Sequence, residues 1–164
     1  MKRLPWLLLP LGALAADFAS KSWILNLLRH EGHSKTIIEG FFSLTLGYNT
    51  GAIFGSFRNA PEWLRIGLFS LAGIAAIFYF GKLFLAESTS TLERVALGLI
   101  LGGAAGNGLD RILHGHVVDF LDFVFGIWHY WTFNLADSCI VVGAILFGIS
   151  LLTAKKTVET APTA

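Results

Sequence analysis

Ionisable residues within or beside long apolar stretches are the groups of this sequence best placed to do chemistry. Such a group costs about 2.5 to 3.5 kcal/mol inside lipid on insertion scales, so each should pair with another group or serve a function. The set comprises Asp17, Lys21, Asp110, Arg111, Asp119, Asp122 and Asp137. Two carboxyl groups that face each other share one proton: the ionised one can activate water while the protonated one polarises a peptide carbonyl. Asp119 and Asp137 are the candidates for such a pair.

The other ionisable groups have simpler interpretations. Asp17 and Lys21 are four residues apart and so share a helical face, where an ion pair would neutralise both. Asn107, Asp110 and Arg111 share a face in the same way, and Arg111 could brace a carboxylate through a forked hydrogen bond. These residues are expected to support a site rather than to carry out catalysis.

Two asparagines have alternative roles that the sequence leaves open. Asn49 and Asn134 could orient the backbone of a substrate. Asparagine is also frequent in turns and at the first position of a helix, where its side chain bonds the local backbone.

The composition points to lipid as the main solvent. The chain has 164 residues, of which 54% are hydrophobic and 14% charged, against about 25% charged in a typical soluble domain. A net charge of +1 without a basic run argues against a nucleic-acid partner. The single cysteine, Cys139, allows neither an intramolecular disulfide nor thiol exchange between two cysteines.

The apolar residues fall into four blocks of about the length needed to span a bilayer. They cover about residues 4–28, 63–85, 92–113 and 133–152, with loops at 29–62 and 114–132. The first block opens like a secretory signal peptide, but its apolar pattern continues beyond Ser22 and three more blocks follow, so we expect it to be retained. The fold class predicted is a four-helix transmembrane bundle forming one domain over residues 1–164.

The basic residues predict the orientation of the bundle. Six of them lie on the side of the termini and of the short loop between the second and third blocks: Lys2, Arg3, Lys82, Arg94, Lys155 and Lys156. The opposite side has Arg29, Lys35 and Arg58, so the bias is modest. The positive-inside rule then predicts cytoplasmic termini and outward-facing long loops. Asp119 and Asp137, 18 residues apart, would meet at the outer membrane boundary.

The outer loops carry strand patterns, and the third block carries a helix-packing pattern. In residues 42–48, large apolar or aromatic side chains alternate with small or polar ones, and residues 117–124 alternate so that Val117, Asp119, Leu121 and Phe123 share one face. These patterns predict a small β-sheet, with a turn at Asn49-Thr50-Gly51. Gly98, Gly102 and Gly106 recur every four residues, which lets a neighbouring helix approach closely.

Five segments, taken in order, carry a resemblance to a known family. They are Asp17-Phe18-Ala19-Ser20-Lys21; Phe41-Phe42-Ser43-Leu44 with Tyr48-Asn49-Thr50-Gly51-Ala52-Ile53-Phe54; Gly102-Gly103-Ala104-Ala105-Gly106-Asn107-Gly108-Leu109-Asp110-Arg111; Val117-Val118-Asp119-Phe120; and Phe133-Asn134-Leu135-Ala136-Asp137. They resemble the motifs of the lipoprotein signal peptidases, also called signal peptidase II, over about residues 17–147. The sequence departs from the usual motifs at Phe18, where Gln is common, and at Gly108, where Leu is common.

The resemblance implies a membrane aspartyl endopeptidase whose catalytic residues are Asp119 and Asp137. It implies supporting or substrate-binding roles for Asp17, Lys21, Asn49, Gly51, Asn107, Asp110, Arg111, Asn134 and Ala136. The implied substrate is a prolipoprotein whose cysteine carries diacylglyceryl, cut just before that cysteine. It further implies an enzyme without cofactor or metal, acting as a monomer among the lipids of the bacterial cytoplasmic membrane.

Two other functions are compatible with parts of the sequence. His114, His116 and Asp119 are potential zinc ligands, although the sequence has no HExxH motif. Carboxylates within the membrane could instead form the proton relay of a small transporter, although the four blocks show no internal repeat.

Overall fold

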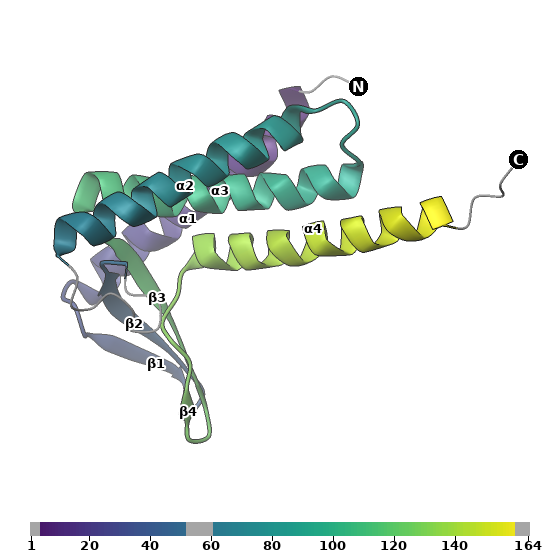
Figure 1. Ribbon diagram of the computed structural model, residues 1–164. Helices are drawn as coiled ribbons and strands as arrows, with labels where there is room; N and C mark the ends of the chain where they lie inside the picture. Colours follow the sequence, from purple (N-terminus) through teal and green to yellow (C-terminus); the bar gives the residue numbers. More distant parts are fainter. Residues whose placement is uncertain (1–3, 52–60, 160–164) are drawn as a thin grey trace, which may run out of the picture.

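The computed structural model describes residues 4–51 and 61–159, which form a helical bundle with a small sheet at one end (Figure 1). Lys2, Arg3, Arg58 and the motif residues Ala52, Ile53 and Phe54 lie outside the described residues. The elements in chain order are η1 (Leu4–Leu7), α1 (Leu8–Leu28), β1 (Ser34–Ile38), β2 (Phe42–Asn49), α2 (Glu62–Leu85), α3 (Thr91–His114), β3 (Val117–Phe125), β4 (Trp128–His129) and α4 (Leu135–Glu159).

Helix α3 is the centre of the bundle, because α1, α2 and α4 all pack against it. Among the described residues, the segments Leu4–Leu28, Ile66–Leu85 and Leu135–Thr153 are long and apolar enough to cross a membrane by themselves. The remaining helix, α3, has Glu93, Arg94, Asp110 and Arg111 near its ends and is shielded by the other three helices. The predicted class, a helical membrane bundle with a small sheet, is confirmed.

Small residues let the helices approach α3 closely. A Cβ atom added at Gly102 would lie 2.7 Å from the Pro10 carbonyl oxygen of α1, and one at Gly103 would lie 2.4 Å from the Ala136 carbonyl oxygen of α4. Backbones at this separation leave no room for a side chain, which explains why glycine stands at these two positions.

The turn between α2 and α3 is fixed by polar contacts. Ser90 and Glu93 form a capping box at the start of α3. The Arg94 guanidinium donates hydrogen bonds to the carbonyl oxygens of Phe84, Ala86 and Thr89. These bonds satisfy carbonyl groups around the end of α2, which would otherwise lack partners.

The four strands form an antiparallel sheet in the order β1-β2-β3-β4. Gly47 of β2 pairs with Asp119 of β3, next to a β-bulge between Leu44 and Gly47. Side chains from the sheet and from α1 form a buried core: Ile24, Leu28, Leu44, Leu46, Val118 and Phe120. This core attaches the sheet to the end of α1 and fixes the position of Asp119.

The last helix begins later than the apolar block suggested. Phe133 forms a bridge with Leu121 of β3, and α4 starts at Leu135. The block was expected to be helical from residue 133, but the Phe133 backbone is bonded to the sheet. Asn134 is therefore the residue that joins the sheet to α4.

Candidate active site

Asn134 and Asp137 form a reciprocal cap at the start of α4. The Asn134 side-chain oxygen accepts from the Asp137 N–H at 2.9 Å, and the Asp137 Oδ2 accepts from the Asn134 N–H at 3.1 Å. Both backbone N–H groups belong to the first turn of the helix, which would otherwise lack acceptors. The cap fixes the position of the Asp137 carboxyl group.

The same asparagine also holds Asp119. Asp119 is 2% exposed, and its carboxyl group accepts from Asn134 Nδ2 at 2.7 Å and from Asn49 Nδ2 at 3.0 Å. Asn134 thus contacts both aspartates, one through its amide nitrogen and the other through the cap. Asp119 and Asp137 are therefore linked through one asparagine side chain.

Asn107 of α3 completes this amide network. Its Nδ2 donates to Asp137 Oδ1 at 2.7 Å, and its side-chain oxygen accepts from Asn134 Nδ2 and from Lys21 Nζ, each at 3.1 Å. The orientation of the amide is fixed, since Lys21 can only donate. Asn107 connects the carboxyl pair to a buried charge cluster.

That cluster consists of Asp17, Lys21 and Asp110. Lys21 Nζ lies 2.7 Å from Asp17 Oδ2 and 2.9 Å from Asp110 Oδ2, so the lysine bridges α1 and α3. Asp17 Oδ1 accepts from the Ala136 N–H at 2.9 Å, and Asp110 Oδ2 accepts from the Val118 N–H at 3.2 Å. The pairing of Asp17 with Lys21 is present, and Asp110 joins it. The cluster anchors the starts of β3 and α4.

Gly51 shapes the loop that presents Asn49. Its φ of 98° is unfavourable for other residues, and a Cβ atom there would lie 2.5 Å from the Phe69 ring. The Gly51 N–H donates to the Asn49 side-chain oxygen at 2.9 Å, which turns the Asn49 amide nitrogen toward Asp119. Asn49 therefore stabilises the turn through its side-chain oxygen and hydrogen-bonds Asp119 through its amide nitrogen.

Arg111 differs from the expectation of a forked bond to a carboxylate. Its guanidinium donates to the Asn107 carbonyl oxygen at 3.2 Å and lies 5.7 Å from the centre of the Phe69 ring. Its buried Nε has no hydrogen-bond partner among the described residues. Its charge acts on Asp137, Asp119 and Asp110 through space.

The environment of Asp119 favours its protonated form. Burial raises the pKa of the Asp119 carboxyl group to about 7, and the nearby Asp137 charge acts in the same direction. The hydrogen bonds from Asn49 and Asn134 and the Lys21 charge oppose this rise in pKa. Near neutral pH the pair can therefore hold one proton, as acid–base catalysis by two carboxyl groups requires.

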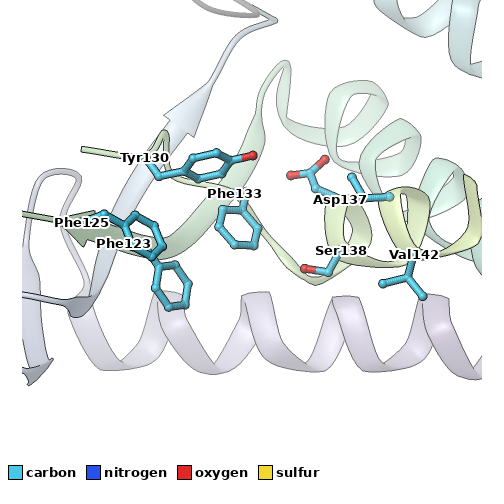
Figure 2. Close-up of a pocket in the computed structure, with 8 residues that line it drawn as sticks. Phe123, Phe125, Tyr130, Phe133, Asp137, Ser138 and Val142 are labelled. Atoms are coloured by element: carbon cyan, nitrogen blue, oxygen red, sulfur yellow. The ribbon is translucent and has the colours of Figure 1, made fainter. Parts of the chain in front are cut away.

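Two cavities reach Asp137 from different sides. The larger, of about 490 Å³, lies between the β3–β4 hairpin and α4, with Asp137 at one end of a row of aromatic side chains (Figure 2). It is lined by Phe123, Phe125, Tyr130, Phe133, Asp137, Ser138, Val141 and Val142. The other, of about 330 Å³, lies between α2, α3 and α4 and includes Phe69, Asn107 and Arg111.

The aromatic residues of the larger cavity and Phe69 are not among the site residues predicted from the sequence. Their types gave no signal, because aromatic side chains in an apolar chain are more often packing residues. Phe123, Phe125 and Tyr130 lie in the loop predicted at residues 114–132, whereas Phe133 and Phe69 lie outside both predicted loops.

The potential zinc ligands do not converge. Within residues 4–51 and 61–159, no group of three His, Cys, Asp or Glu side chains is arranged to hold a metal ion. The His116 ring packs on Tyr48 at 4.2 Å, and Asp119 is bonded to amide groups. Asp122 also lies apart from the carboxyl pair, bound to Thr45 and His129.

Comparison with known proteins places this site in context. Residues 9–153 match the family model described as signal peptidase (SPase) II. The lipoprotein signal peptidase of Burkholderia vietnamiensis is 44% identical over 142 residues, which is 87% of this chain and 84% of the relative. That of Burkholderia mallei is 43% identical over 143 residues, with the same coverage.

Two solved structures share the fold, and both are described as bacterial membrane enzymes studied by the in meso method. The first, at 2.3 Å resolution, has a TM-score of 0.82 and 27% identity, covering 98% of this chain and 94% of its own. The second, at 1.9 Å resolution, has a TM-score of 0.76 and 30% identity, and the match covers 90% of this chain and 92% of the solved chain.

Proposed function

Because this chain belongs to the signal peptidase II family, a group of lipoprotein signal peptidases, we propose that Asp119 and Asp137 are the two carboxyl groups with which it cuts its substrate. The chain is a membrane protease that removes signal peptides from prolipoproteins. Family membership overturns the transporter alternative. The observation that carries the assignment of the pair is the contact of one side chain, Asn134, with both aspartates.

The contacts favour different protonation states for the two residues. Asp119 is buried, and its pKa is raised to about 7, so it is the member of the pair that can hold the proton near neutral pH. Asp137 accepts hydrogen bonds from Asn107 Nδ2 and from the Asn134 N–H, and both bonds stabilise a carboxylate. Asp137 also faces both cavities, where water and substrate can reach it.

The reaction then follows general acid–base catalysis. Asp137 takes a proton from water, and the water oxygen attacks the carbon of the scissile carbonyl group while Asp119 donates its proton to the carbonyl oxygen. The tetrahedral intermediate collapses when the new hydroxyl group of the intermediate returns a proton to Asp119, and Asp137 protonates the departing amine. The pair ends with the proton distribution with which it began.

The substrate side of the proposal rests on the chemistry of the cavities. The larger cavity is lined mainly by aromatic and aliphatic side chains and suits the lipid chains of a diacylglyceryl-modified cysteine. The polar groups of the other cavity, Asn107 and Arg111, suit the peptide backbone. A substrate spanning both would pass Asp137, with cleavage just before the modified cysteine.

The proposed setting is the bacterial cytoplasmic membrane. Both termini face the cytoplasm and the site faces outward, as the distribution of lysine and arginine favours. A single chain supplies all the contacts around the pair, which is consistent with a monomer among membrane lipids.

The test is cleavage of a purified prolipoprotein by the purified protein in lipid or detergent. Cleavage directly before the cysteine, only when that cysteine carries diacylglyceryl, is the expected result. A folded enzyme that leaves the modified substrate intact would refute the substrate assignment. Activity that EDTA abolishes and zinc restores would refute catalysis by carboxyl groups alone.

A further inference from the structure

A row of polar contacts crosses the sheet from β1 to β4. Ser34 Oγ lies 2.9 Å from Thr45 Oγ1, which donates to Asp122 Oδ2 at 2.7 Å. The other oxygen of Asp122 lies 2.5 Å from His129 Nε2. None of these residues contacts the carboxyl pair, so the proposed reaction leaves this row without a role.

The opposite face of the same hairpin forms the wall of the larger cavity. Side chains alternate along a strand, so Phe123 and Phe125 point away from the face that carries Asp122. With Tyr130 and Phe133 they line the cavity that ends at Asp137 (Figure 2). The position of the hairpin therefore sets the shape of this cavity.

Few backbone contacts hold the end of the hairpin. Strand β4 has two residues, paired as Val124 with His129 and Phe125 with Trp128. At the tip, Ile127 is 94% exposed, and the hairpin extends away from the helices, toward the bottom of the view (Figure 1). The contact between His129 and Asp122 is thus an important connection between β4 and the rest of the sheet.

We propose that the His129–Asp122 pair is a positioning device that holds the aromatic wall for the apolar part of the substrate and is strengthened when His129 is protonated. The inference rests on the proposed function in one respect: it takes this cavity as a binding site of the peptidase. His129 and Asp122 do not touch the reacting atoms, so they are positioning residues rather than catalytic residues.

The charges around His129 determine the direction of the pH dependence. Asp122 of β3 is the charged group in contact with it, while β2 and β1 present the Thr45 and Ser34 hydroxyl groups. Histidine changes its charge between about pH 5 and 8. With a protonated His129 the contact is an ion pair with a charge-assisted hydrogen bond, and with a neutral His129 it is a neutral hydrogen bond. Substrate binding should therefore be tighter at the acidic end.

Steady-state kinetics of His129→Gln against wild type tests the proposal. Glutamine keeps a neutral hydrogen-bond donor but cannot carry the charge. We expect its KM to exceed that of wild type about threefold at about pH 5.5 and to match it at about pH 8.5, with kcat nearly unchanged. Taking the ratio of the two enzymes at each pH cancels the titration of the carboxyl pair.

Two further variants make the result specific. Asp122→Asn should give the same KM ratios, and the double variant should add nothing, because either change removes the ion pair. His114→Gln is the matched control, since His114 is an exposed histidine at the end of α3, and its ratio should stay near one at every pH. A ratio independent of pH, an equal effect of His114→Gln, or a change in kcat alone would overturn the proposal.

Hydrogen exchange gives a readout that does not require catalysis. At one acidic pH, the amides of residues 124–130 should exchange faster in His129→Gln than in wild type, while those of α3 should not change. Equal exchange in both proteins would overturn the positioning role whatever the kinetics. If exchange changes but KM does not, the pair holds the hairpin and the cavity is not the binding site, which overturns the proposal through its functional premise.

Discussion

At the scale of single residues, Asn134 determines how the two carboxyl groups relate to each other. Its amide nitrogen donates to Asp119 and to Asn107, and its side-chain oxygen accepts from the Asp137 backbone. All its hydrogen-bonding groups are used for local structure, so an aspartate in its place would lose two donated bonds. The site is fixed mainly by amides, which hold two carboxyl groups together without adding charge.

Substitution of either aspartate tests the proposed pair. Asp119→Asn removes the acid and Asp137→Asn removes the base, so each should lower kcat by about a thousandfold or more. Because the two groups act as a unit, the double variant should be little worse than either single variant. The measurement is cleavage of lipid-modified prolipoprotein under single-turnover conditions.

Asp122→Asn is the control for this prediction. Asp122 lies on the same strand as Asp119 but outside the pair, so the kcat of this variant should stay close to that of wild type. Near wild-type cleavage by a folded, membrane-inserted Asp137→Asn protein would remove Asp137 from the mechanism.

The raised pKa of Asp119 predicts the alkaline limb of the pH profile. Asp119 must carry a proton to act as the acid, and its pKa is about 7, so kcat/KM should fall as the pH rises above about 7. The Asn49 hydrogen bond lowers this pKa, so removing it should raise the pKa. Asn49→Ala should therefore move the alkaline limb to higher pH, even if its maximum rate is lower. A limb that moves to lower pH would contradict the assigned role of Asn49.

The sequence indicated part of this site. The spacing of Asp17 and Lys21 predicted their ion pair, since helical geometry fixes neighbours four residues apart. It did not predict that Asp110 joins them or that Arg111 stacks on Phe69, because these contacts depend on how separate helices pack. The link through Asn134 depends on the meeting of β3 with the start of α4.

At the scale of elements, the contact of α3 with α4 positions Asn107 against Asp137. Gly103→Ala would place a methyl group 2.4 Å from the Ala136 carbonyl oxygen, so α4 must shift. We expect a loss of about 1 to 3 kcal/mol in the free energy of unfolding. Activity should fall by about tenfold or more, because small displacements of reacting groups are costly. Thermal unfolding and cleavage assays measure the two effects.

Gly108→Ala is the matched control on the same helix. A Cβ atom there would meet nothing within 4 Å, and alanine is the better helix former, so stability should be unchanged or slightly higher. Equal destabilisation by both substitutions would show that the helix itself, rather than the contact with α4, is sensitive.

The Lys21 cluster connects α1, α3 and α4 and should be important for stability. Lys21→Met leaves the buried Asp17 carboxylate and the half-buried Asp110 carboxylate without their cation, which should cost about 3 to 5 kcal/mol of unfolding free energy. Lys35→Met changes an exposed lysine of β1 and should have little effect. Unfolding of both variants in the same detergent gives the comparison. Similar stability of the Lys21 variant and wild type would contradict this role.

The strands show why the elements were only partly predictable. Strand β2 alternates clearly in sequence, because Leu44 and Leu46 point into the core between more exposed residues. Strand β3 is buried on both faces over its first four residues, so its alternation is weaker. Strand β1 is exposed along its whole length, so burial imposes no pattern on it. Strand β4 has two residues, too few to show a period, and depends on its pairing with β3.

At the scale of the whole molecule, the distribution of side chains is suited to lipid. The outer surfaces of the helices expose large apolar groups, such as Leu71, Phe78 and Ile145, while the described interior holds Asp17, Lys21 and Asn107. Composition and four apolar blocks are sufficient to predict this arrangement, because lipid selects apolar residues wherever a helix faces it. The hydrophobic blocks alone could not identify α3 as the central helix.

The last prediction concerns the orientation of this bundle in the membrane. The sheet lies at one end, while η1, the α2–α3 turn and the far end of α4 lie at the other (Figure 1). In a Cys139→Ser background, Thr36→Cys on β1 and Ser88→Cys in the α2–α3 turn are exposed positions at the two ends. Because the modest bias of lysine and arginine favours a cytoplasmic second end, a membrane-impermeant maleimide should label residue 36 on intact spheroplasts and residue 88 only after lysis. Labelling in the reverse order would place Asp119 and Asp137 at the cytoplasmic boundary, where a signal peptide processed on the outer face could not reach them.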